Sequence, residues 1–171
     1  MERSSNNINE AEFKKLLEAL LSDKGTERKK ARKALVANGK KSLPYLKEFI
    51  HHPKHFYRWE AMKTMEEIAD PESIPIFIEA LEDDESDIRW IAAQGLIKIG
   101  KLSLQPLLKA IVEKPDSIFV LSSAHHVLHD LKINEHLPSG FPVDKLLSVL
   151  KGSATKAEIE LTAYEIMKQF G

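Results

Sequence analysis

A repeat of 31 residues is the feature that most limits how this chain can fold. Pro44, Pro75 and Pro106 follow one another at this interval, and Trp59 and Trp90 are separated by the same step. A fixed period of this length, with helical patterning inside each unit, is typical of a helical solenoid. In such a fold each unit buries its apolar face against its neighbours. The sequence therefore predicts an all-α fold, an α-solenoid of about five helical hairpins.

Helix signals divide the chain into pairs of helices. Asn9 with Glu12, and Thr155 with Glu158, have the spacing of capping boxes that begin helices. No segment shows a sustained alternation of apolar and polar residues, so no sheet is expected. We predict a single repeat domain over residues 1–171, with repeats at about 9–39, 42–70, 71–100, 103–131 and 142–171.

Composition narrows the class of protein further. The chain has 171 residues, a formal net charge of -1 and no cysteine, which excludes disulfides and thiolate chemistry. Its first residues are polar, and no apolar stretch approaches the length that spans a bilayer. These features predict a cytoplasmic protein with no membrane segment.

One repeat carries a recognisable residue pattern. Residues 86–100 contain an aspartate, an aliphatic residue and an arginine, followed by two alanines, a leucine and a terminal glycine: Asp87, Ile88, Arg89, Ala92, Ala93, Leu96 and Gly100. This pattern resembles the HEAT-like repeats named after phycobilin lyases, and weaker matches extend the resemblance over most of the chain. The resemblance implies a curved, right-handed stack (an α-α superhelix) whose second helices line the inner surface. It also implies structural links between adjacent repeats through Asp87, Arg58 and Arg89.

The inner surface is the predicted binding site. Trp90 lies on a different side of its helix from the core residues, and Trp59 is its equivalent in the second repeat. Two such rings about 10 Å apart would form an aromatic ladder that grips a peptide or stacks bases. Alternatively, both rings pack between repeats, as most large apolar side chains do. The candidate ligand-binding residues on this concave face are Trp59, Trp90, Met62, Arg58, Arg89 and Leu121.

Histidine pairs suggest a possible metal site. His51 with His55, and His125 with His129, have the spacing that places two imidazoles on one helical face. Pro53 interrupts the first pair, and neither pair has the glutamate of a zinc-protease motif. Deoxyhypusine hydroxylases, which are also built from HEAT-like repeats, carry His-Glu dipeptides that this chain lacks. We therefore predict no catalytic residue, no metal and no cofactor.

Charge is distributed unevenly along the chain. The first repeat is rich in lysine and arginine, whereas residues 66–87 contain ten acidic residues and no basic one. A basic end could follow phosphates, but the acidic middle would repel the same polyanion. The sequence therefore favours a monomeric, non-catalytic scaffold for a protein or peptide partner. The alternatives are a lyase-like or metal-dependent enzyme acting on a small ligand in the same groove, and nucleic-acid binding through the first repeat.

Overall fold

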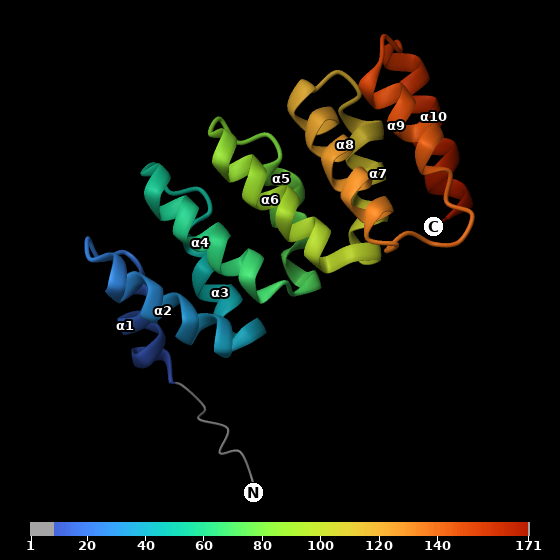
Figure 1. The fold of residues 1–171 in the computed structure, drawn as a ribbon. Helices are drawn as coiled ribbons and strands as arrows, with labels where there is room; N and C mark the ends of the chain where they lie inside the picture. Colours follow the sequence, from blue (N-terminus) through green and yellow to red (C-terminus); the bar gives the residue numbers. More distant parts are fainter. Residues whose placement is uncertain (1–8, 171) are drawn as a thin grey trace, which may run out of the picture. The chain divides into compact units, whose positions relative to one another are not determined.

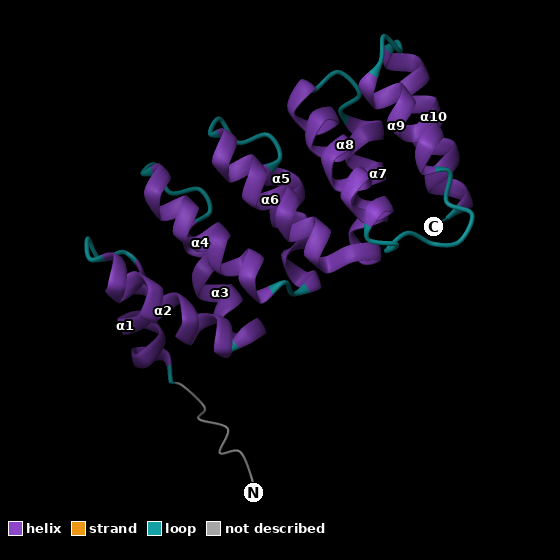
Figure 2. Ribbon diagram, viewed as in Figure 1, coloured by secondary structure: helices purple, strands orange, loops and turns teal. Residues whose placement is uncertain are grey.

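The computed structural model describes residues 9–170, and within them it contains helices joined by turns and loops, with no strand (Figures 1 and 2). This confirms the predicted all-α class. The chain divides into two compact units, unit 1 (Met1–Ile68) and unit 2 (Ala69–Gly171). The prediction of a single domain over residues 1–171 stays a prediction.

Unit 1 contains two helical hairpins, and its second hairpin has a very short first helix. The predicted capping box at Asn9 is present, because the Glu12 N–H donates to Asn9 Oδ1 at 3.0 Å and the Asn9 N–H donates to Glu12 Oε2 at 2.9 Å. Leu35, Leu46 and Met65 are fully buried in the core of this unit. Its helices are α1 (Glu10–Leu20), α2 (Gly25–Ala37), α3 (Leu43–Leu46) and α4 (His55–Ile68).

A buried carboxylate joins α2 to α4. Glu60 is 1% exposed, and it accepts hydrogen bonds from Arg28 Nε at 3.0 Å and Arg32 Nη2 at 2.8 Å. Arg32 also reaches Glu67, with Nη1 and Oε1 3.3 Å apart. A buried carboxylate is tolerated only when it is paired and hydrogen-bonded. Two of the basic residues of the first repeat therefore hold unit 1 together.

Unit 2 contains three hairpins around one core. Phe77, Leu96, Leu107 and Leu128 are fully buried in it. Asp70 caps its first turn by accepting from the Glu72 N–H at 2.8 Å. The helices are α5 (Ile74–Ala80), α6 (Ser86–Ile99), α7 (Leu104–Glu113), α8 (Ile118–Ile133), α9 (Val143–Lys151) and α10 (Lys156–Gln169).

The last hairpin is turned over relative to the two before it. α6 packs against α8 and α5 packs against α7, as expected for successive repeats (Figure 1). In the fifth repeat, however, the first helix α9 packs against α8, and the second helix α10 packs against α7. The expectation that every second helix occupies the same layer is therefore wrong for this repeat. The long connection after α8, where Glu135 and Gly140 have positive φ angles, supplies the chain length for the reversal.

The spacing between α6 and α8 is 32 residues, one more than the repeat that the prolines define. Ile88 and Val120 are each 1% exposed and Ala92 and Ala124 are fully buried, so these pairs are equivalent. A strict step of 31 residues would make Leu121 the equivalent of Trp90, but the extra residue enters after Pro106 and that equivalence does not hold. Ser122 takes the position of Trp90.

An arginine at the start of three second helices closes the turn of its own hairpin. Arg28 Nη1 donates to the Ser22 and Asp23 carbonyls at 2.9 and 3.0 Å, and Arg58 Nη1 donates to the His52 carbonyl at 3.0 Å. In the third repeat Arg89 Nη1 donates to the carbonyls of residues 83 and 84 at 2.6 and 3.0 Å. The arginines thus have a structural role inside their hairpins, and two of them also contact the next repeat: Arg28 binds Glu60, and Arg89 stacks on Phe119.

Candidate functional site

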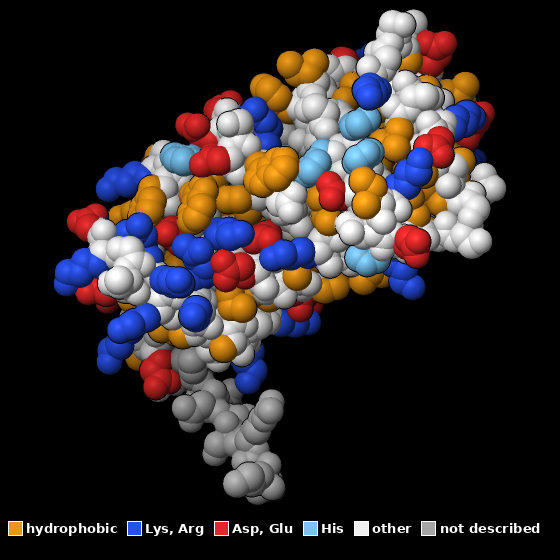
Figure 3. Space-filling view, viewed as in Figure 1, with side chains coloured by type: hydrophobic (Ala, Val, Ile, Leu, Met, Phe, Trp, Pro, Cys, Tyr) orange, Lys and Arg blue, Asp and Glu red, His pale blue; other side chains and the backbone are white. Residues whose placement is uncertain are grey.

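Exposed aromatic and apolar side chains gather in unit 2 where α6 and α8 lie side by side. Trp90 is 57% exposed, Phe119 40% and Ile118 72%. Such large apolar side chains rarely cluster on a surface without a binding role. Figure 3 shows hydrophobic and histidine side chains together over these two helices. We call this region the Trp90 surface and define it by Trp90, Ile118, Phe119, Ser122 and His126.

The indole of Trp90 is held by a stacked histidine. The rings of Trp90 and His126 lie 4.5 Å apart between centroids, with 23° between their planes. Gln94 Nε2 lies 3.0 Å from His126 Nε2, and His126 Nδ1 lies 3.3 Å from Asp130 Oδ2. An amide nitrogen can only donate, so His126 accepts at Nε2 and carries its proton on Nδ1, facing the carboxylate. The stack is therefore oriented from both sides before any partner arrives.

Arg89 ties the α5–α6 turn to the start of α8. Its Cζ lies 4.1 Å from the centroid of the Phe119 ring, the geometry of a cation–π contact. Because the same guanidinium donates to two carbonyls of the turn, it braces Phe119 at the surface. Arg89 therefore contributes to the predicted site by positioning the Phe119 ring.

A hollow of about 290 Å³ opens beside Trp90. The small residues Ser86 and Ala93 of α6, and Ser122 and Ser123 of α8, leave this room beside the indole. An aromatic wall with hydroxyl groups opposite suits one side chain of a bound segment. The lining consists of Ser86, Arg89, Trp90, Ala93, Ser122, Ser123 and His126.

The other predicted site residues lie elsewhere. Trp59 is half-buried in unit 1, with Arg32 Cζ 5.3 Å from its ring centroid. Met62 is 1% exposed and belongs to the core of that unit, so its predicted place on a binding surface is wrong. Leu121 is half-buried on α8 and does not line the hollow. The aromatic ladder from Trp59 to Trp90 would span both units and stays a prediction.

The histidine pairs do not assemble a metal site by themselves. The rings of His125 and His129 are nearly parallel, with centroids 6.2 Å apart. Within residues 9–170, neither belongs to a group of three ligand atoms within 4.8 Å of one another. His51 precedes α4, which begins at His55, so this first pair does not share a helical face.

Burial lowers the pKa of His125 below its usual value near 6.5, and the positive charge of Lys151 and the nearby His129 and His126 lower it further. His125 therefore binds a proton more readily in the unfolded chain than in the folded one. The folded state is not penalised above about pH 6.5, where His125 is neutral in both states, and the free energy of unfolding falls as the pH drops below that value. We expect H125N to reduce the loss of unfolding free energy between about pH 7 and about pH 5.5. Urea unfolding at both pH values measures this difference in free energy. H136N is the control, because His136 is exposed. Equal losses in H125N and the unchanged protein would contradict this.

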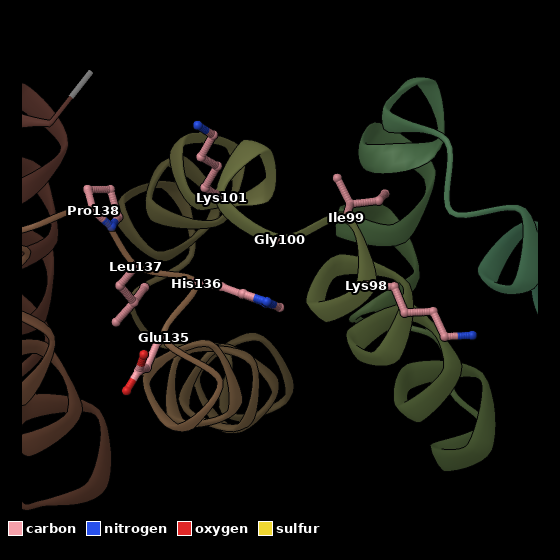
Figure 4. Close-up of a pocket in the computed structure, with 8 residues that line it drawn as sticks. All are labelled: Lys98, Ile99, Gly100, Lys101, Glu135, His136, Leu137 and Pro138. Carbon is pink, nitrogen blue, oxygen red and sulfur yellow. The ribbon is translucent and has the colours of Figure 1, made fainter.

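A second hollow, of about 600 Å³, lies between the end of α6 and the segment after α8 (Figure 4). His136 projects toward Gly100 across this gap, whereas Lys98, Lys101 and Glu135 point away from it (Figure 4). The polar groups do not converge, so this hollow lacks the arrangement of a small-molecule site.

The second helices of successive repeats pack side by side, α2 against α4 and α6 against α8, which is the arrangement of a helical-repeat protein. The family model of HEAT repeats matches residues 13–97 and 43–129. The chain belongs to the HEAT-repeat family.

The chain is also similar to a solved structure. This is the structure of the complex of CpcE and CpcF of phycocyanin lyase from Nostoc sp. PCC7120, with 23% sequence identity and a TM-score of 0.61. The match covers 92% of this chain and 99% of that one, which shows a shared fold. No curated protein matches the sequence. Within the described residues, none of the helices has the length and apolar character needed to cross a bilayer.

Proposed function

We propose that this chain is a non-catalytic protein-binding scaffold that captures an extended segment of a partner on the Trp90 surface. The observation that carries the proposal is the indole of Trp90, which is more than half exposed yet fixed in place by His126. Fixed, exposed tryptophans are frequent binding hot spots, because they bury a large area at little entropic cost.

The surroundings of Trp90 support a peptide rather than a small substrate. The hollow beside it is open and shallow, and exposed apolar side chains continue along α8 to Ile118. A small substrate would favour a more enclosed cavity with converging polar groups. The similar solved structure is itself a complex of two protein chains, which supports a protein partner for this fold.

The proposal predicts that W90A weakens peptide binding about 30-fold, the effect of removing a hot-spot side chain. The binding peptides are selected from a library of short random sequences on the unchanged full-length chain alone, and their binding to W90A is measured afterwards. Fluorescence anisotropy then measures the dissociation constants of the selected peptides.

L161A is the matched control, because Leu161 is 58% exposed on α10 and lies outside the Trp90 surface. We expect L161A to change the dissociation constant less than about threefold, as surface substitutions outside an interface do. W90F, which keeps an aromatic ring, should retain part of the affinity. Peptides that bind W90A and the unchanged chain equally well, or a selection that yields no peptide, would overturn the proposal.

A further inference from the structure

We propose that the partner segment of the Trp90 surface is basic, with lysine or arginine next to one apolar anchor side chain. The inference rests on the proposed function and adds the chemistry of the partner. The charge of the partner segment is inferred from the charged residues near the hollow, because the aromatic side chains alone do not specify it.

The acidic α5–α6 turn forms one edge of the hollow. Asp84 and Glu85 are exposed there, and the next residue, Ser86, lines the hollow. Arg89 holds this turn in place through the carbonyls of residues 83 and 84, so the backbone of the turn is tied to the base of the Trp90 surface. Figure 3 shows the acidic side chains at this end of α6.

The cations near this edge are fewer than its carboxylates. The Arg89 guanidinium is stacked on Phe119 and donates to backbone carbonyls, and Lys114 forms an ion pair with Glu82 at the far side of the turn. At the other side of the stack, His126 faces the carboxylate of Asp130. The carboxylates of Asp84, Glu85 and Asp130 outnumber the one cation of the lining, Arg89, and this excess of negative charge favours a cationic partner at Trp90.

The same field selects among ligands that could stack on Trp90. A nucleic-acid base could lie on the indole, but its phosphates would meet Asp84 and Glu85 and be repelled. A partner arginine or lysine meets favourable charges at the turn, and it can also lie on the exposed indole face as a cation–π pair. An apolar side chain of the same segment fills the hollow beside Ala93 and Ser123. A short basic and apolar peptide satisfies all three features.

The test uses the full-length chain and those selected peptides whose binding depends on Trp90. We expect lysine and arginine to be enriched beside an aromatic or aliphatic residue in these peptides. D84K should weaken their binding roughly three- to tenfold, since it replaces an attraction by a repulsion at the rim. Binding to the unchanged chain should weaken as salt rises from about 50 to about 300 mM.

E160K is the matched control, because Glu160 is an exposed carboxylate on α10, away from the hollow, and the substitution changes the net charge equally. It should leave the dissociation constant within about twofold. A peptide whose basic residues are replaced by glutamate should bind D84K better than it binds the unchanged chain. Selected peptides that need Trp90 but are neutral or acidic, or equal effects of D84K and E160K, would overturn this inference and leave the proposed function standing. A failure of Trp90 dependence would overturn both.

Discussion

Replacing Glu60 by alanine is expected to lower the free energy of unfolding of unit 1 by about 3 kcal/mol. Glu60 is 1% exposed and binds two guanidinium groups, which are themselves mostly buried, with side chains 24% and 18% exposed for Arg28 and Arg32. Removal of the carboxylate leaves two positive charges without their common partner inside the α2–α4 contact. Breaking one side of a buried ion pair costs more than the pair itself contributes.

Urea unfolding followed by the emission of Trp59, in a W90F background, measures this effect within unit 1. E67A is the matched control, because Glu67 pairs with the same Arg32 but its side chain is 32% exposed. The loss for E67A should stay below about 1 kcal/mol, as for other exposed pairs. If both substitutions have equal effects, Glu60 does not hold α2 and α4 together.

Replacing Gly95 by alanine is expected to destabilise unit 2 by about 2 kcal/mol. Helix propensity alone would predict the opposite, a gain of about 1 kcal/mol for alanine over glycine within a helix. However, a Cβ at this position would lie 2.5 Å from Phe77 Cζ and 2.6 Å from Cε2. Phe77 is fully buried, so its ring cannot move away without disturbing the contact between α5 and α6.

Urea unfolding followed by Trp90 emission in a W59F background measures the effect of G95A. G25A is the control, since a Cβ there meets no atom closer than 3.6 Å and should not destabilise the chain. Adding F77L to G95A should recover part of the loss by making room for the new methyl group. A G95A protein as stable as G25A would show that the contact between α5 and α6 adapts freely.

Local features of the fold could be predicted from the sequence. The capping boxes at Asn9 and Thr155 depend on residues three positions apart, and both form as expected. The proline period likewise indicates helical repeats, because each repeat uses the same turn and core positions. Gly39 follows α2 with a positive φ angle, the conformation for which glycine is common just after a helix.

Features that depend on contacts between helices could not be predicted in this way. The extra residue between Pro106 and α8 moves Ser122, rather than Leu121, to the position of Trp90. The stacking of His126 on Trp90 follows from how α6 and α8 are placed side by side, which no spacing within one helix reveals. The reversal of α9 and α10 arises in the same way, since the segment after α8 has no repeat to be compared with.

Glu60 shows the same limit within unit 1. Its sequence position is that of an ordinary charged residue on a helix, and charged residues are mostly exposed. Only the approach of α2 brings Arg28 and Arg32 to its two oxygens. The basic character of the first repeat left phosphate binding open as an alternative, whereas in the structure two of its arginines bind a buried carboxylate.

The most direct measurement uses the W59F variant, in which Trp90 is the only tryptophan. The fluorescence of Trp90 is followed while this variant is titrated with a selected peptide. If the peptide covers the indole, the emission should shift to shorter wavelength and quenching by acrylamide should fall as the complex forms. The same titration with W90F confirms that the signal belongs to Trp90. A peptide that binds with an unchanged emission and unchanged quenching of Trp90 would place the partner elsewhere on the chain and contradict the proposed binding surface.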